Sequence, residues 1–141
     1  MSNIKEKEYE AKGYTKEHTK MWMDSVKGKK DEAIEYIEKT YPETAKEFQQ
    51  LQYEQYELFC KKQMDYGPSN IAMGTSLDTD EEKRLSKIGL IVRINDKIQR
   101  LINLVVKNNR KAQNEPTIDA FKDLACYGII AQIVEAGKWG K

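Results

Sequence analysis

The 141-residue sequence is poor in the residue types that build the commonest metal and nucleophilic sites. It contains one histidine, His18, and two cysteines, Cys60 and Cys126, which are far apart in the sequence and have no Cys or His neighbour. This argues against a zinc site with the usual ligand spacing, and it makes a Ser-His-Asp or Cys-His triad hard to assemble. We expect both cysteines to be buried, reduced thiols within helices.

The sequence also lacks a strong charge of one sign and a long apolar run. Its 24 Lys and Arg residues nearly balance 23 Asp and Glu residues, so the net charge is only +1. General binding to nucleic acid needs an excess of positive charge and is therefore not expected. No stretch of about 18 apolar residues occurs and the mean hydropathy is -0.80, so we expect no membrane span and no membrane partner. The charged segment 1–8 has no apolar core of a secretory signal, which favours a cytoplasmic location.

Proline is scarce, and Pro42, Pro68 and Pro116 lie where one periodic segment gives way to another. Between them, apolar residues recur at the helical spacings of three and four. The sequence therefore predicts an all-α fold, a compact helical bundle of about five helices. The expected helices are 15–27, 31–40, 42–65, 84–108 and 117–137, with a long functional loop at 66–83.

The ends of these helices carry recognisable signals. Thr15 and Asp31 are expected N-caps, Pro42 suits a first helical turn, and Gly137 suits a helix C-terminus. We divide the chain into an N-terminal helical extension at 1–45 and a main domain that follows it, the two together forming one compact unit.

The first group of candidate site residues lies at the end of the expected helix 42–65. Charged residues spaced by three and four share one stripe of this helix, and the stripe ends at Asp65. Asp65 is a candidate ligand for a divalent cation, and Lys62 is a candidate phosphate contact. The alternative is a solvated face with an ion pair between Glu57 and Lys61, followed by a turn.

The second group lies on the expected helix 84–108. At about 100° per residue, five polar side chains fall within about one third of its circumference. They are Arg93, Asp96, Lys97, Arg100 and Asn103. Two guanidiniums and an ammonium beside one carboxylate suit a di- or triphosphate, because arginine offers a rigid bidentate fork. The alternative is an ordinary amphipathic helix whose surface ion pairs contribute little.

The third group opens the expected helix 117–137. Asp119 and Asp123 are four residues apart and share one face, while 124–134 is apolar nearly all round and is expected to be buried. Two carboxylates at this spacing repel one another, so a Mg²⁺ ion, or cations such as Arg93, Lys97 and Arg100, must compensate them. Mg²⁺ suits them, because it takes a few carboxylates and completes its shell with water and substrate phosphates. The alternative is that Asp119 starts the helix and Asp123 pairs with a structural arginine.

Taken together, the three groups resemble the nucleotide-modification-associated domain family of bacteriophages. The resemblance is carried by Lys62-x-x-Asp65-Tyr66-Gly67-x-Ser69, then Gly89-x-x-x-Arg93-x-Asn95-Asp96-Lys97-x-x-Arg100-Leu101-x-Asn103-Leu104, then Asp119-x-x-x-Asp123-Leu124-Ala125-x-Tyr127-Gly128-Ile129-Ile130. It covers about residues 50–136. Such domains are similar in helical pattern to the all-α nucleoside triphosphate pyrophosphohydrolases of the MazG and dimeric dUTPase group. Those enzymes hold Mg²⁺ against a nucleoside triphosphate with acidic residues on neighbouring helices.

The resemblance implies a nucleotide-binding domain at 46–141 in a phage protein that acts in the bacterial cytoplasm. The implied ligand is a nucleotide or a nucleotide-derived small molecule, bound in a helical cleft of a homo-oligomer, with Mg²⁺ as the cofactor. The ligand- and phosphate-binding residues would be Lys62, Tyr66, Asn70, Arg93, Lys97, Arg100 and Asn103. Tyr66 would stack on a base, and Asn70 or Asn103 would read its edge. The metal ligands would be Asp65, Asp96, Asp119 and Asp123.

Three functions are open at this point. The first is Mg²⁺-dependent hydrolysis of a nucleoside triphosphate to a monophosphate and pyrophosphate. The second is a non-catalytic sponge that sequesters a nucleotide second messenger of a host defence pathway; Ala120, where the pyrophosphohydrolase pattern has a glutamate, favours this function. The third is a helical adaptor that uses Trp22 and Trp139 as exposed interface anchors.

Overall fold

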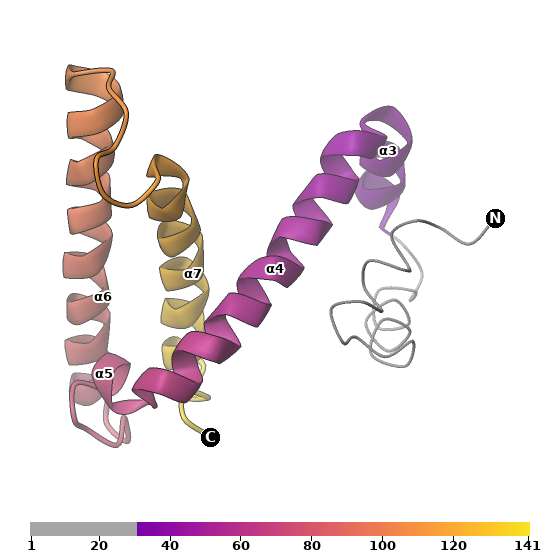
Figure 1. Cartoon of the computed structure of the whole chain (residues 1–141). Helices are drawn as coiled ribbons and strands as arrows, with labels where there is room; N and C mark the ends of the chain where they lie inside the picture. The colour runs from indigo at the N-terminus through magenta and orange to yellow at the C-terminus, as the bar shows by residue number, and fades with distance from the viewer. Residues whose placement is uncertain (1–30) are drawn as a thin grey trace. The chain divides into compact units, whose positions relative to one another are not determined.

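The computed structural model describes residues 31–141, and all their regular structure is helical (Figure 1). The elements in chain order are α3 (Glu32–Thr40), α4 (Pro42–Tyr66), α5 (Ser69–Ala72), α6 (Asp80–Leu101), the π-helical segment η1 (Ile102–Lys107) and α7 (Thr117–Glu135). The prediction of an all-α fold is confirmed. No helix in this part of the chain is long and apolar enough to cross a membrane. The expected helix 15–27, with Thr15, His18 and Trp22, lies outside the described residues.

The described residues belong to two units that divide within α4, one ending at residue 50 and the other comprising 51–141. In the first unit, the Asp31 carboxylate accepts a hydrogen bond of 2.8 Å from the backbone N–H of Ala33 and thereby caps α3. Pro42 is the first residue of α4, where its missing N–H costs no helical hydrogen bond. Both helix starts agree with the sequence signals.

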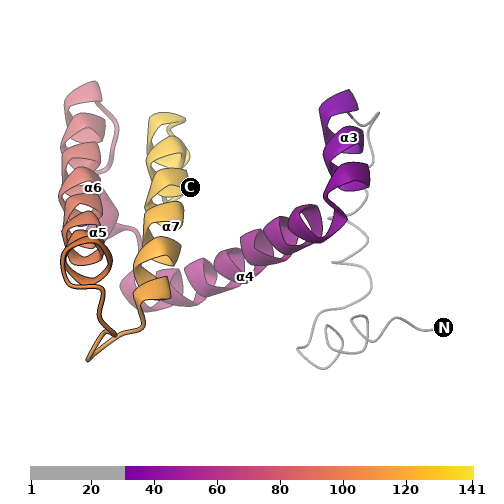
Figure 2. The ribbon, with the colours of Figure 1, turned by 90° about the horizontal axis from the view of Figure 1, so that it is seen from above.

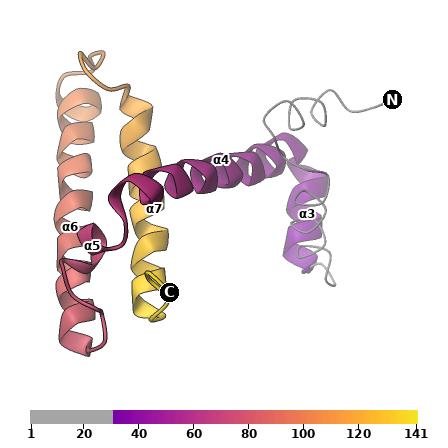
Figure 3. The ribbon, with the colours of Figure 1, turned by 60° about the horizontal axis from the view of Figure 1, so that its bottom comes forward.

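In the second unit, α6 and α7 lie side by side and run antiparallel, as Figure 1, Figure 2 and Figure 3 all show. Leu90 of α6 belongs to one buried apolar cluster with Ile130 and Val134 of α7. Ile71 and Ala72 bring α5 into the same cluster. Each fully buried aliphatic side chain of this kind contributes about 1.5–3 kcal/mol, so the cluster fixes α5, α6 and α7 as one framework.

The segment 66–83, expected as one long loop, is partly helical because it contains α5 and the first turn of α6. The Thr79 hydroxyl accepts a hydrogen bond of 3.2 Å from the Glu82 N–H, and the Glu82 carboxylate accepts one of 3.3 Å from the Thr79 N–H. This capping box starts α6 at Asp80 rather than at residue 84. Leu77, between the two helices, is buried in the core.

The far end of α6 departs from α-helical geometry at η1. The backbone N–H of Asn108 donates to the carbonyl of Asn103 at 3.2 Å, a spacing of five residues that is typical of a π-helix. The Asn108 amide also donates to the side-chain oxygen of Asn103 at 2.9 Å. The expected continuous α-helix 84–108 therefore ends at Leu101, and Asn103 lies in a wider turn.

Helix α7 is buried on one side only, which corrects the expectation that 124–134 is buried all round. Ile130 and Val134 lie in the core, whereas Ile129 is 51% exposed and Phe121, earlier in the helix, is 52% exposed. An apolar sequence shows what a helix can bury, but the neighbouring elements decide how much of it they cover. In this unit the main partner of α7 is α6, which covers one side.

Trp139 and the two cysteines also differ from their predicted environments. Trp139, expected as an exposed anchor, is only 6% exposed and belongs to the core cluster. Cys60 and Cys126 are free thiols, as expected, but each is half-buried rather than buried. Burial of the Cys126 thiol raises its pKa above the ordinary value.

The end of α7 is a Schellman turn centred on Gly137. The Gly137 N–H donates to the Val134 carbonyl at 3.0 Å, and the Lys138 N–H donates to the Ile133 carbonyl at 3.1 Å. Gly137 has a φ of +68°, a conformation that costs an L-residue with a side chain free energy. The expected stop signal at Gly137 is therefore the turn that ends the helix.

We predict that Gly137→Ala lowers the free energy of unfolding by about 1 kcal/mol, because alanine strains the left-handed conformation. Gly128→Ala is the matched control: Gly128 lies inside α7 with no atom within 4 Å of an added Cβ. Alanine there raises the free energy of unfolding by about 0.5–1 kcal/mol, since it is the better helix former. Urea unfolding followed by far-UV circular dichroism measures both changes, and equal effects of the two variants would contradict the assignment.

Candidate functional site

A cavity of about 680 Å³ opens in the unit 51–141. Its walls come from four helices and from the residue that precedes Pro116. The lining residues are Gln55, Leu58, Phe59, Lys62, Gln63 and Tyr66 of α4, Asn70 and Ile71 of α5, Arg93 and Lys97 of α6, then Glu115, and finally Asp119, Lys122, Asp123, Cys126, Tyr127 and Ile130 of α7. We refer to this space as the candidate cavity.

The candidate cavity brings together residues from all three groups that the sequence singled out. Seven of the eleven predicted site residues line it, namely Lys62, Tyr66, Asn70, Arg93, Lys97, Asp119 and Asp123. The other four do not, namely Asp65, Asp96, Arg100 and Asn103. Asp65 and Asp96 are exposed and lie outside the cavity that Asp119 and Asp123 line.

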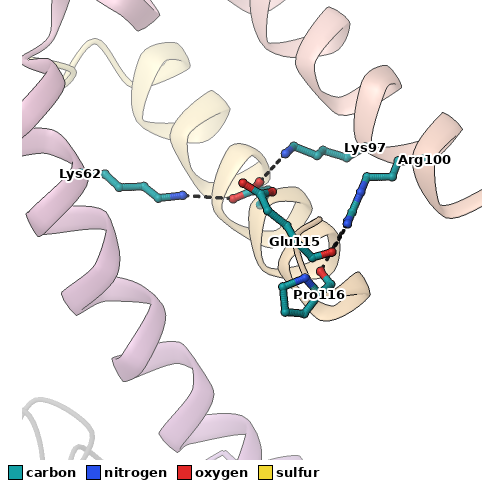
Figure 4. Close-up of polar contacts among 6 residues, drawn as sticks. Lys62, Lys97, Arg100, Glu115 and Pro116 are labelled. Atoms are coloured by element: carbon teal, nitrogen blue, oxygen red, sulfur yellow. Dashed lines mark hydrogen bonds and ion pairs between the residues drawn. The ribbon is translucent and has the colours of Figure 1, made fainter. Parts of the chain in front are cut away.

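Asp123 joins three helices through its two carboxylate oxygens (Figure 4). The Lys97 ammonium of α6 lies 2.7 Å from Oδ2, and the Lys62 ammonium of α4 lies 3.3 Å from Oδ1. The alternative that we considered for this residue was a structural arginine. The structure has the carboxylate paired with two lysines: Lys97, one of the cations expected to compensate it, and Lys62, which was not expected there.

The two ion pairs shift the pKa values of the groups involved. Burial by itself would raise the pKa of Asp123, but the hydrogen bond from Lys97 and the nearby charge of Lys62 outweigh it and lower the pKa below the ordinary value. The hydrogen bond to Asp123 in turn raises the pKa of Lys97. Asp123, Lys62 and Lys97 therefore form a charged cluster at neutral pH, with one more positive than negative group.

Arg93 connects the cavity to α5. One guanidinium nitrogen donates to the backbone carbonyl of Asn70 at 3.2 Å. Close by, the buried Ser86 hydroxyl donates to the carbonyl of Ile71 at 2.6 Å. Because Ser86 and Arg93 are both on α6, they fix α5 against that helix and set the position of Asn70 on the cavity wall.

Arg100 acts at the start of α7 rather than in the cavity wall. Its guanidinium donates to the backbone carbonyl of Glu115 and, at 3.5 Å, to that of Pro116 (Figure 4). These bonds hold the segment that leads into α7, and Glu115 from this segment lines the candidate cavity. In this arrangement Arg100 positions an acidic residue of the cavity wall.

Several lining residues were not singled out from the sequence. They are Gln55, Phe59, Gln63, Glu115, Lys122 and Tyr127. Helical spacing identifies some of them: Tyr127 is four residues after Asp123 on the same face, and Phe59 is three residues before Lys62. Nothing local marks Glu115, because its place depends on the contact between Arg100 and the α7 entry segment.

The donor set of the cavity does not fit a magnesium ion in this arrangement. Among residues 31–141, no three His, Cys, Asp or Glu side chains gather closely enough to hold a metal ion. Each oxygen of Asp123 already meets a lysine ammonium. A metal ion held by Asp119 and Asp123 would require both lysines to move away from Asp123. Binding of Mg²⁺ therefore remains a prediction.

No family model, curated protein or solved structure matches the chain in the comparisons made. The resemblance to the phage nucleotide-modification-associated domains therefore remains an expectation from the quoted motifs.

We predict that Asp123→Asn weakens the acid dependence of stability. The lowered pKa of Asp123 means that its contribution to the free energy of unfolding is present above the unfolded value, about 3.9, and is lost as pH falls through the folded value. The variant lacks this loss, so its urea midpoint falls less between neutral and acidic pH. Asp96→Asn, at an exposed position outside the cavity, is the control and keeps the acid dependence of the unchanged chain. Identical acid profiles of the unchanged chain and Asp123→Asn would refute the role of the ion pairs.

Proposed function

We propose that the chain binds a nucleotide or a nucleotide-derived small molecule in the candidate cavity. One observation carries this proposal: Lys62, Arg93 and Lys97, from two helices, line one cavity that aromatic and amide side chains also line. Its volume, about 680 Å³, falls within the range of small-molecule sites, about 300–1,000 Å³. Phosphates would lie against the cations, and the base against the rings and amides.

The cationic wall suits phosphate oxygens. Arg93 has five N–H donors, and its bond to the Asn70 carbonyl uses one nitrogen, so the guanidinium keeps donors for a phosphate. Lys62 and Lys97 each carry three N–H donors and share one carboxylate. Charge-assisted hydrogen bonds from such groups are about twice as strong as neutral ones.

The remaining wall suits a base and a sugar. Tyr66, Phe59 and Tyr127 provide ring faces, and base–aromatic stacking contributes about 1–3 kcal/mol per base. Asn70 and Gln63 provide amides that donate and accept hydrogen bonds. The positions of these rings and amides favour no particular base.

We favour capture of an intact ligand over hydrolysis. The pairing of Asp123 with two lysines supports capture, because it commits the carboxylate to organising cations. With the implied phage context, the function is sequestration of a nucleotide second messenger in the bacterial cytoplasm. The second candidate, Mg²⁺-dependent pyrophosphohydrolysis, is what the family resemblance implies, and it requires Lys62 and Lys97 to release Asp123 so that the carboxylate can meet a metal ion.

The test is a binding panel of ribo- and deoxyribonucleoside triphosphates, cyclic dinucleotides and ADP-ribose, with and without Mg²⁺. Arg93→Ala is expected to weaken binding about ten- to a hundredfold, the loss of one charge-assisted hydrogen bond. Arg84→Ala is the matched control, because Arg84 is an exposed arginine on the same helix outside the cavity. Calorimetry measures the affinities, and mass spectrometry identifies the ligand released by heating.

Release of the intact ligand supports capture, whereas release of pyrophosphate and a monophosphate only when Mg²⁺ is present establishes the second candidate. Unchanged affinity in both Arg93→Ala and Lys97→Ala would show that the ligand does not bind in the candidate cavity. If no member of the panel binds the unchanged chain, the proposed function is wrong.

A homo-oligomer is part of the same proposal. Ile91 and Val92 of α6 are 62% and 56% exposed, and Phe121 and Ile129 of α7 are similarly exposed. Exposed large apolar side chains on neighbouring helices are candidates for an interface between copies of the chain. We predict that Ile91→Glu and Phe121→Glu lower the mass that sedimentation equilibrium measures for the unchanged chain, while Arg84→Glu does not. A monomeric unchanged chain at high protein concentration rules the oligomer out.

A further inference from the structure

The segment after α7, residues 138–141, folds back onto the corner where α4 meets α5. Its main contact is the Trp139 indole, whose N–H donates to the backbone carbonyl of Pro68 at 3.0 Å. The two residues are 71 positions apart in the sequence. Trp139 is almost fully buried there, although α7 ends four residues earlier, at Glu135.

The backbone on either side of Trp139 is shaped for this contact. Gly137 turns the chain out of α7, and Gly140 has a φ of +71°, which a residue with a side chain adopts only at a cost. A Cβ on Gly140 would also lie 3.1 Å from Cβ of Pro68, closer than ordinary contact. Both the conformation and the close approach require glycine at position 140.

The indole lies directly behind the wall of the candidate cavity. Its ring meets Phe59 edge-on, with ring centres 6.0 Å apart and planes at 62°. It also belongs to the buried cluster that contains Ile71. Phe59 and Ile71 line the cavity, so Trp139 contacts one wall residue and shares the core cluster with a second, although it does not line the cavity itself.

The corner where α4 meets α5 is held by three hydrogen bonds, each from a different side chain to a different backbone carbonyl. Trp139 donates to Pro68, Arg93 donates to Asn70, and Ser86 donates to Ile71. Arg93 and Ser86 attach the corner to α6, whereas Trp139 attaches it to the end of α7. The cavity residues Tyr66 and Asn70 lie on either side of Pro68, so the Trp139 bond fixes the point between them.

We propose that Trp139 is a positioning residue of the candidate cavity. The docked indole holds the Pro68 carbonyl, and this keeps Tyr66 and Asn70 on the wall that receives the ligand. Docking of 138–141 and ligand binding then strengthen one another, because a coupling between two sites is reciprocal. This inference rests on the proposed function only for the coupling; the positioning of the corner stands without a ligand.

The first experiment tests positioning by amide hydrogen exchange without ligand. Trp139→Phe keeps an aromatic ring but removes the N–H donor. We expect exchange at Gly67 and Ala72, whose amides bond to the carbonyls of Gln63 and Pro68, to rise about three- to tenfold. Lys138→Ala, an exposed position in the same segment, is the control and leaves these rates unchanged. Gly140→Ala, a second variant in the same segment, is expected to raise the same two exchange rates.

Unchanged exchange at Gly67 and Ala72 in both Trp139→Phe and Gly140→Ala would overturn the positioning role. If either variant fails to fold, the other and the unchanged chain still decide the question, since the Trp139 indole N–H can be followed directly by NMR. In a chain where Pro68 holds it, that proton exchanges slowly, and fast exchange in the unchanged chain refutes the bond.

The second experiment tests the coupling with the tightest-binding member of the nucleotide panel. In the unchanged chain this ligand is expected to slow exchange of the Trp139 indole N–H, and Trp139→Phe is expected to weaken binding about three- to tenfold. A purely structural Trp139 would not respond to the ligand, so unchanged indole exchange in the bound state overturns the coupling. Failure of every nucleotide to bind refutes the proposed function instead, and the exchange at the corner still decides positioning.

Discussion

The rest of the site depends on one carboxylate, that of Asp123, and the two lysine ammoniums that it holds. The core cluster fixes α6 against α7, but it contains no buried residue of α4. The Lys62 bond to Asp123 is therefore a direct tie between α4 and α7, and the contact of Phe59 with Trp139 ties α4 to the segment that follows α7. Exposed ion pairs stabilise a fold little. Here the side chains of Asp123 and Lys97 are only 18% and 25% exposed, so water screens their charges less and the pair keeps a defined geometry.

Features that depend on neighbouring residues in the sequence were predictable. Apolar spacing gave the helices, Asp31 and Pro42 marked two helix starts, and Gly137 marked a helix end. The sequence also carries a signal for the start of α6, namely Thr79 followed by Glu82 three residues later. The prediction of a loop at 66–83 overlooked this capping box. The burial of Trp139 had no local signal at all, because it results from a hydrogen bond to a residue 71 positions away.

The candidate site shows the same difference between features set by neighbouring residues and features set by distant contacts. Arg93 and Lys97 lie on one stripe of a regular α-helix, so the helical angle alone placed them together correctly. The same angle assigned Arg100 and Asn103 to that stripe. Arg100 instead meets the chain that leads into α7, and η1 changes the rotation per residue before Asn103. The separation of Asp65 and Asp96 from the acids of α7 could not be derived, because it depends on how α4, α6 and α7 face one another.

The corner at Pro68 has a consequence for how ligand preference changes in evolution. Under the proposed function, the cations that would face the phosphates are carried by long helices, and Asp123 pairs with the two lysines among them. Tyr66 and Asn70, in contrast, flank a short turn whose carbonyls at Pro68 and Asn70 accept hydrogen bonds from Trp139 and Arg93, and the side-chain oxygen of Asn70 accepts a further one of 2.9 Å from the Ile71 N–H. Substitution of Tyr66 leaves these hydrogen bonds intact, whereas substitution of Asn70 keeps the two carbonyl bonds and removes the one to the Ile71 N–H. Under the proposed function, a lineage would therefore exchange the ring at position 66, which would meet the base, while it keeps the groups that would meet the phosphates, and it would acquire a new ligand without rebuilding the domain.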